Sequence, residues 1–328
     1  MSIPAFSDIS KPANDLLNKD FYHLSAGTIE VKSNTPNNVA FKVTGKSSHD
    51  KATSGAVRIA SGPISFVKDM RQNRSRESSR TRRTNQCRFR FGTVVTPRFQ
   101  LLLISVAPRP GITVTQTWNT LNALDTKVEA ADNFAKGLKL EGAFSFLPQS
   151  QKKGAKFNLY FKQPKFHFRS FFDLLKGPTA NVDAVVGHEG FLAGASAGFD
   201  VQNANVTTFA AAVGYAHPTY TAAITASDKA SVFAASYYHK VNALVEAGAK
   251  AQWDSKTPGG AVGLEVATKY RIDPVSFVKG KINDRGVTAI AYNVLLRPGV
   301  TLGIGASFDT QKLDQATHKV GASFTFEG

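Results

Sequence analysis

The sequence of 328 residues is poor in sulfur-containing side chains and has no long apolar run. It contains one Cys and two Met, and a single Cys excludes both a disulfide framework and a metal site built from several cysteines. The longest mainly apolar stretch, residues 99–107, is far shorter than the roughly eighteen apolar residues that a membrane helix needs. Residues 1–20 carry three Asp and no apolar core run, so we expect no secretory signal peptide.

The sequence also lacks the residue constellations of common enzymes. Its seven His are scattered without metal-ligand spacing, and no glycine-rich phosphate loop precedes a helix. His188 and Glu189 come nearest to an acid–base pair, but their neighbours indicate an ordinary turn. We therefore expect no enzyme activity, no metal and no cofactor.

What the sequence does contain is a repeated strand pattern, clearest in residues 220–326. In residues 300–309, for example, one face is apolar and the other consists of Thr301, Gly303, Gly305, Ser307 and Asp309. Alternation over about nine to eleven residues, without a helical period, is typical of strands that cross a bilayer in a barrel. Because lipid cannot pair with backbone polar groups, such strands must close on one another. The sequence predicts an all-β membrane barrel, inserted into the outer membrane of an organelle.

Before the first strand, residues 5–20 predict a short amphipathic helix. Ser7 is expected to cap its start, because a hydroxyl accepts a free amide of the first turn. Pro12 is expected to break or kink it in the middle, because proline lacks the amide donor. The alternative is an ordinary surface helix.

Residues 57–110 interrupt the strand pattern. They hold 12 Lys/Arg and 2 Asp/Glu, whereas the whole chain has a net charge of +16. A retained intron or gene-model error is the favoured interpretation, ahead of a genuine, disordered insertion. An RNA-binding element comes last, so no nucleic-acid partner is expected. Within this segment, residues 99–107 are a candidate for a substitute strand.

Four motifs elsewhere resemble the mitochondrial voltage-dependent anion channels, and most closely the fungal mitochondrial outer-membrane porins. They are the N-terminal run from Ser7 to Phe21, the Gly137-Leu138-Lys139 triplet, the signature from Tyr270 to Gly286, and the terminal pattern of Lys319, Gly321, Phe324 and Phe326. The resemblance covers residues 1–56 and 111–328 and fails across residues 57–110. It divides the chain into a pore helix at 1–22, first strands at 23–56, an Arg/Ser-rich insertion at 57–110 and the rest of the barrel at 111–328.

The resemblance implies a barrel of about 19 strands, with the helix inside the pore and the first and last strands paired in parallel. It implies a voltage-gated, weakly anion-selective channel for ATP, ADP, phosphate and small ions across the mitochondrial outer membrane. The lipid bilayer is then a partner, and a homo-oligomer is a further possibility. The alternatives are a related barrel for protein import, a soluble all-β binding protein, and a variant that residues 57–110 make non-functional.

Candidate site residues follow from the polar strand faces and from the resemblance. Each single Lys is read as a solvated side chain of the barrel, while the set is expected to bias the pore toward anions. The pore-lining or nucleotide-contacting set is Lys11, Lys19, Lys42, Lys46, Lys139, Lys279 and Lys281. The resemblance implies dinucleotide contacts at Val287, Thr288, Ala289, Gly305, Ala306, Ser307, Phe308 and Asp309. It makes Lys319, Gly321, Phe324 and Phe326 a sorting signal for membrane insertion.

Overall fold

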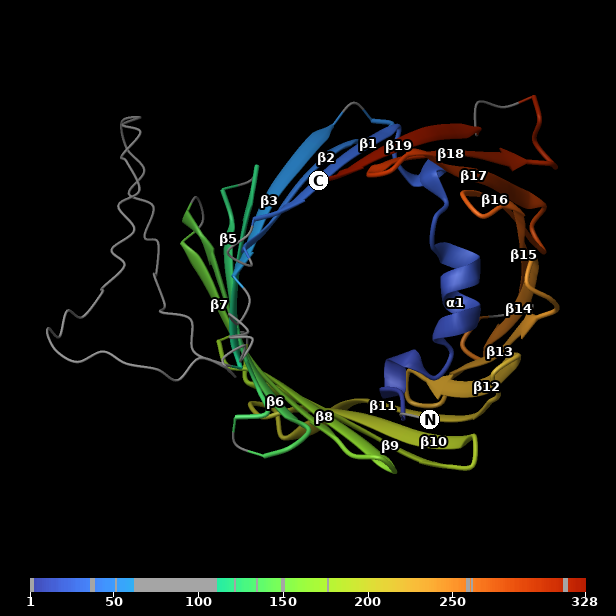
Figure 1. Cartoon of the computed structure of the whole chain (residues 1–328). Helices are drawn as coiled ribbons and strands as arrows, with labels where there is room; N and C mark the ends of the chain where they lie inside the picture. Colours follow the sequence, from blue (N-terminus) through green and yellow to red (C-terminus); the bar gives the residue numbers. More distant parts are fainter. Residues whose placement is uncertain are drawn as a thin grey trace, which may run out of the picture.

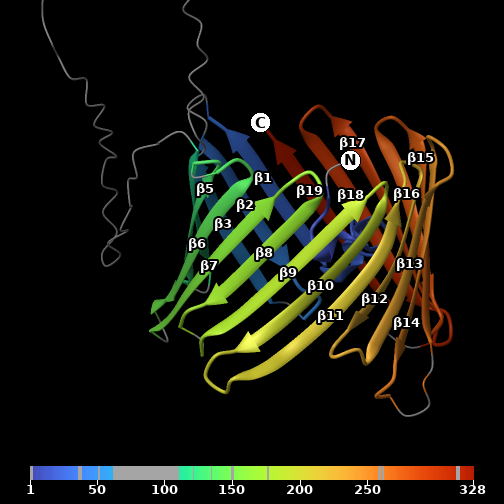
Figure 2. The same cartoon turned by 90° about the horizontal axis from the view of Figure 1, so that it is seen from below.

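The computed structural model is a closed barrel of 19 strands with a helical segment inside it (Figures 1 and 2). It describes residues 3–35, 39–50, 52–61, 111–120, 122–133, 135–148, 151–175, 177–257, 260, 262–314 and 318–328. The strands are β1 (Gly27–Asn34), β2 (Val39–Ser47), β3 (Thr53–Ser61), β4 (Ile112–Asn119), β5 (Leu124–Ala131), β6 (Leu138–Leu147), β7 (Lys152–Lys162), β8 (Phe166–Asp173), β9 (Thr179–His188), β10 (Phe191–Asp200), β11 (Asn205–Ala216), β12 (Tyr220–Ser227), β13 (Val232–Lys240), β14 (Val245–Asp254), β15 (Gly263–Asp273), β16 (Ser276–Asn283), β17 (Val287–Arg297), β18 (Val300–Asp309) and β19 (Lys319–Glu327).

Each strand pairs antiparallel with the next along the chain, and β1 closes the barrel by pairing in parallel with β19. An odd number of strands in an up-and-down barrel requires this arrangement, because the first and last strands then run in the same direction. The parallel register joins Gly27 to Ala322 and Lys32 to Glu327. The predicted fold class, strand number and parallel closure are confirmed.

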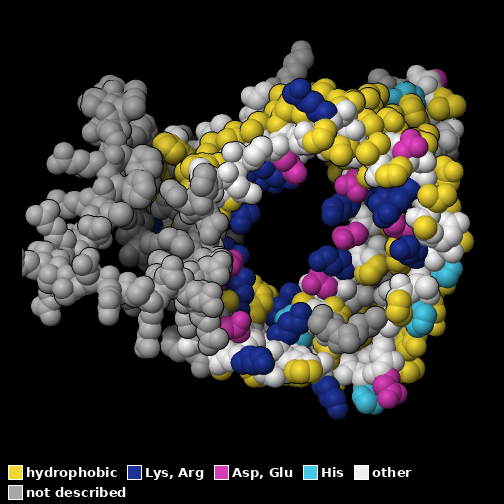
Figure 3. Space-filling model, viewed as in Figure 1, with side chains coloured by type: hydrophobic (Ala, Val, Ile, Leu, Met, Phe, Trp, Pro, Cys, Tyr) yellow, Lys and Arg dark blue, Asp and Glu magenta, His cyan; other side chains and the backbone are white. Residues whose placement is uncertain are grey.

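The strand alternation gives the wall an apolar outer face and a polar inner face. Among the exposed apolar side chains are Phe191 at 65% and Ile224 at 64% of their full accessible surface, which is the pattern of a lipid-facing barrel. Outward aromatic rings also pair near strand ends, as Phe324 does with Phe326 and Phe233 with Trp253. Figure 3 shows the same division: apolar side chains cover the outside, while charged ones line the opening.

The N-terminal segment consists of a 3-10 turn η1 (Phe6–Asp8), the helix α1 (Lys11–Asn18) and a second 3-10 turn η2 (Tyr22–Leu24). The prediction of one helix over residues 5–20 is therefore too long, and the roles given to Ser7 and Pro12 are wrong. Pro12 lies in the first turn of α1, where its missing amide would have had no partner, so it starts the helix rather than kinking it. Ser10 occupies the N-cap position, and its hydroxyl accepts a hydrogen bond from the Asn14 side chain at 3.0 Å. None of the described helices is long and apolar enough to cross a membrane.

The interruption of the barrel begins later than residue 57. Strand β3 continues to Ser61, with Arg58 opposite Lys42 of β2 and Ser61 opposite Val114 of β4. The wall therefore closes directly from β3 to β4, and residues 57–61 belong to the barrel. The candidate strand at residues 99–107 lies outside the described residues.

Candidate functional site: the lumen and its docked N-terminal segment

Strand register identifies the side chains that face the lumen. One rung runs from Lys281 on β16 to Ala289 on β17, then to Ser307 on β18 and Lys319 on β19. Residues at paired positions share a face of the sheet, and Ala289 is covered by Phe21 of the internal segment. The rung therefore faces inward. Extended around the barrel, the same registers turn the predicted lysines of the strands, Lys42, Lys46, Lys139, Lys279 and Lys281, toward the lumen.

The apolar stripe of α1 packs against the inner wall formed by β13, β14 and β15 (Figure 1). Leu16 and Leu17 are buried against Ala267 and Tyr238. Small wall residues make this approach possible, since a Cβ on Gly248 would lie 2.9 Å from a methyl of Leu16. Burying an apolar side chain contributes about 1.5–3 kcal/mol, so each of these leucines stabilises the docked helix.

The turn η2 packs directly against three glycines of β18 and β19, namely Gly303, Gly305 and Gly321. A Cβ on Gly305 would meet the backbone nitrogen of Tyr22 at 2.8 Å, and one on Gly321 would collide with the carbonyl oxygens of Tyr22 and Ser25. The Tyr22 hydroxyl accepts a hydrogen bond from the Asn293 side chain. Gly321, predicted as part of a sorting signal, thus also has a packing role in the folded barrel.

Lys279 fastens the C-terminal end of α1 to β16. Its ammonium donates hydrogen bonds to the carbonyl oxygens of Asp15 at 3.2 Å and Lys19 at 2.8 Å. It also lies 3.8 Å from a carboxylate oxygen of Asp20 and 5.2 Å from the centre of the Phe21 ring. A cation suits this place, because the last carbonyls of a helix carry partial negative charge. The Lys279 side chain is only 2% exposed, so the prediction that it lines the open pore is wrong: the helix covers it.

A second polar contact holds the other end of the segment. Arg169 on β8 donates three hydrogen bonds to Asp183 on β9, at 2.9, 3.2 and 2.8 Å, and one to the Ser7 hydroxyl at 3.3 Å. Ile9 is buried nearby with Val185. The segment is therefore attached at both of its ends, and not only along the apolar stripe of α1.

The two helix lysines stand at opposite ends of α1. Lys11, at its first position, is 56% exposed and forms an ion pair of 3.6 Å with Asp8. Lys19 follows the last residue and is exposed. Both lysines are open to the lumen, but the length of the helix separates them, so they do not form one compact site.

The predicted dinucleotide stretch lies on paired strands, with Val287 opposite Asp309 and Ala289 opposite Ser307. Alternation splits it between two faces, and Thr288, Ala306 and Phe308 occupy outward positions. On the inner face, Ala289 is 1% exposed beneath Phe21 and Gly305 lies under Tyr22. In this docked state the stretch offers the lumen mainly Val287, Ser307 and Asp309.

Across the lumen from α1, ion pairs link β5 and β6. Lys127 contacts Glu129 at 2.7 Å and Glu141 at 2.9 Å, and Lys139 contacts Glu129 at 3.0 Å. Lys127 and Glu129 were not among the predicted site residues, although both stand on the polar face of residues 124–131. Several other lumen-facing cations have no ion-pair partner among the described residues, including Lys46, Lys162, Lys250, Lys281 and Lys319.

His23 of η2 is buried near Lys281 and Lys319 of the inner wall. Burial lowers the pKa of its imidazole, and the charges of Lys281, Lys319 and His49 lower it further. Its carbonyl oxygen lies 2.8 Å from Nε2 of His49. His23 is therefore neutral in the docked segment at neutral pH.

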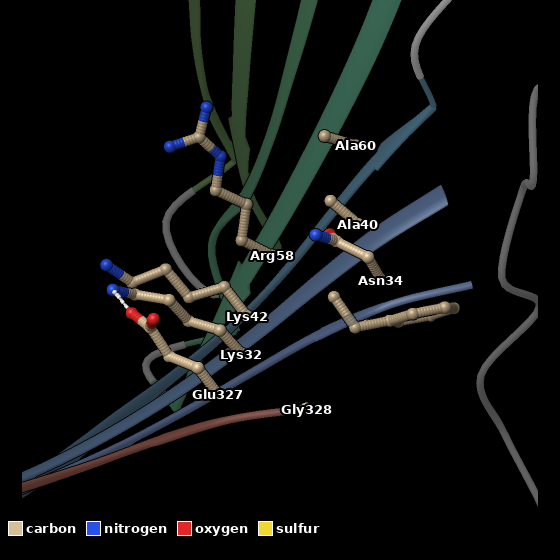
Figure 4. Close-up of a pocket in the computed structure, with 9 residues that line it drawn as sticks. Lys32, Asn34, Ala40, Lys42, Arg58, Ala60, Glu327 and Gly328 are labelled. Atoms are coloured by element: carbon tan, nitrogen blue, oxygen red, sulfur yellow. Dashed lines mark hydrogen bonds and ion pairs between the residues drawn. The ribbon is translucent and has the colours of Figure 1, made fainter. Parts of the chain in front are cut away.

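A cavity of about 380 Å³ opens beside the parallel closure of the barrel (Figure 4). Lys32, Lys42 and Arg58 line it from three neighbouring strands, together with Glu327 of β19. Lys32 contacts Glu327 at 2.6 Å and Glu30 at 3.2 Å, and Lys42 contacts Glu30 at 2.8 Å. Of these four charged lining residues, Lys42 alone was among the predicted site residues.

The chain matches known proteins along its length. The family model "Eukaryotic porin" matches residues 2–62 and 92–321. The expectation that the resemblance fails across residues 57–110 is therefore wrong at both ends of that segment. The mitochondrial outer membrane protein porin of Neurospora crassa is 68% identical over 327 residues, which cover 100% of both chains. The porin of Candida albicans is 42% identical over 99% of both chains, and non-selective voltage-gated ion channel 1 of Saccharomyces cerevisiae is 35% identical over 100% of both. The chain belongs to the eukaryotic porin family.

Proposed function

We propose that the chain forms a voltage-gated, weakly anion-selective channel in the mitochondrial outer membrane, which passes ATP, ADP, phosphate and small ions. The observation that carries this proposal is the charged, open lumen, in which several lysines face water without an ion-pair partner among the described residues. In a wide wet pore each charge acts weakly, but the sum raises the local concentration of anions. The names of the relatives, porins and voltage-gated ion channels, support the same function.

The channel is expected to prefer anions only modestly. Many lumen cations are neutralised by neighbouring carboxylates, as Lys139 is by Glu129 and Lys42 is by Glu30. Multivalent anions respond to the remaining field more strongly than chloride does, because electrostatic energy scales with charge. Lys11 and Lys19 are proposed to contact passing nucleotides, since their ammonium groups stand in the lumen. The inner-face residues among 287–289 and 305–309 are proposed to contact dinucleotides, but only when the N-terminal segment is displaced from the wall.

Two finer proposals concern assembly. Lys319, Gly321, Phe324 and Phe326 are proposed to serve as the insertion signal, supported by their matching pattern on the last strand. Homo-oligomerisation is proposed from the family relation alone. Crosslinking in liposomes at a low protein-to-lipid ratio tests it, and a purely monomeric product would refute it.

Planar-bilayer recording tests the main proposal. The full chain is expected to give large channels that close when the voltage is stepped to either polarity. A variant in which residues 62–110 are replaced by a short Asn-Gly turn is expected to do the same, because β3 already pairs with β4. Channels from the shortened variant only would mean that the insertion blocks function. Absence of channels from both chains would refute the proposed function.

A further inference from the structure

Three cations stand directly opposite one another on neighbouring strands at the closure of the barrel. Lys32 of β1 is paired with Lys42 of β2, and Lys42 is paired with Arg58 of β3. Side chains at such paired positions have Cβ atoms about 5 Å apart, and like charges placed there repel one another. The row therefore needs negative charge close by.

The carboxylates in the described residues supply only part of that charge. Glu30 contacts Lys32 and Lys42, and Glu327 contacts Lys32. The Arg58 side chain forms no ion pair or hydrogen bond with any residue in the part of the chain that the structure describes. With respect to the described residues, the guanidinium is thus the unneutralised end of the row, and it lines the cavity (Figure 4).

We propose that this cavity binds the phosphate groups of a polyanion, held by Arg58 and Lys42. The flat guanidinium presents paired donors that match two phosphate oxygens, and the ammonium of Lys42, which uses one of its three donors on Glu30, adds a further donor from the next strand. The proposal rests on the channel function, because it places a binding site for phosphate-bearing permeants inside the lumen. The volume of about 380 Å³ admits a chain of phosphates.

The third cation, Arg58, is positioned by the barrel wall itself. Arg58 belongs to residues 57–61, which the sequence alone assigned to the insertion and the structure assigns to β3. The strand therefore carries the guanidinium to the wall, and residues beyond Ser61 are not needed to position it. The site takes an inorganic polyphosphate or the phosphate tail of a nucleotide through the same contacts.

Isothermal titration of the full chain in detergent with sodium tripolyphosphate tests the proposal without requiring channel activity. Wild type is expected to bind, and Arg58→Gln is expected to weaken the apparent affinity at least about fivefold, because the bidentate contact is lost. Arg58→Lys is expected to fall between the two. Titration with ATP, compared with tripolyphosphate, tells whether the nucleoside adds affinity.

The matched control is Lys162→Gln. Lys162 ends β7 at the same end of the barrel as the row, faces the lumen and has no ion-pair partner among the described residues. This variant removes one lumen charge but is expected to change the affinity less than about twofold. Equal weakening by both variants, or no binding by wild type, would overturn the site. Binding by a protein that gives no channels would overturn the proposed function and leave the site intact.

Discussion

Replacing Lys279 by Met should loosen the N-terminal segment from the barrel wall. The methionine keeps most of the apolar stem but removes the ammonium that bonds to the carbonyls of Asp15 and Lys19. The Asp15 carbonyl retains the amide of Lys19, at 3.0 Å, whereas the Lys19 carbonyl loses the only hydrogen bond that it accepts in the described structure. The carboxylate of Asp20 is 29% exposed, so water compensates it once the ammonium is gone.

The expected cost is about 1–3 kcal/mol, the penalty for leaving a buried acceptor unpaired. The ammonium of Lys279 is costly to bury, and its removal eliminates that cost, which offsets part of the lost docking free energy. Since 1.4 kcal/mol is tenfold in an equilibrium constant, the undocked fraction should rise about 5- to 140-fold. Lys279→Glu should exceed this effect, because a carboxylate would face the negative end of the helix.

Maleimide labelling measures the undocked fraction directly. A Cys placed at Ala13, which is 3% exposed, reacts only when α1 leaves the wall, and Cys87→Ser removes the native thiol. The control is Lys281→Met, which takes the same charge from the same face of β16. Lys281 also contacts the Phe21 ring, at 4.9 Å, but donates no hydrogen bond to the helix among those described. Equal labelling rates in the Lys279 and Lys281 variants would refute the argument.

Three further predictions test other parts of the lumen. Lys19→Glu should lower the anion preference, and an unchanged reversal potential in a salt gradient would count against it. Gly321→Ala should lower the unfolding temperature in detergent, because its Cβ would collide with η2; Gly280→Ala, whose Cβ would meet nothing within 4 Å, should not, and similar losses would contradict the packing role. Because the pKa of His23 lies below its ordinary value of 6.5 when docked, the undocked state takes up the proton first, so docking weakens as pH falls below about 6.5. The labelling rate at Ala13→Cys, divided at each pH by the rate for the same variant in denaturant because maleimide reacts only with the thiolate, should rise on acidification. His23→Gln should remove that dependence; a persisting pH response would assign it to another group.

The barrel wall could be predicted from the sequence because lipid imposes a simple rule on it. Every second side chain must be apolar on the outside, so alternation alone gave the faces of residues 300–309 and the inward direction of Lys42 and Lys139. The number of strands and the parallel closure came only from the family resemblance. Side-chain alternation does not indicate which distant strand pairs with β1.

The docked segment could not be predicted in the same way, because its contacts join residues far apart in the chain. Nothing near Lys279 in the sequence distinguishes it from Lys281, yet α1 covers only the former. Pro12 was misplaced because a proline in the first turn and one in the middle of a helix look alike until the helix start is known. Arg58 was assigned to the insertion because the alternation around it covers only a few residues before the strand pattern is lost after Ser61.

The reversal potential of the full chain in a planar bilayer, under a potassium chloride gradient, tests the central claim most directly. An excess of unpaired cations in a wet lumen predicts a small potential with the sign of chloride preference, which shifts toward zero when Lys46 and Lys319 are both replaced by Gln. A cation-preferring open state, or a potential that these replacements leave unchanged, would contradict the account.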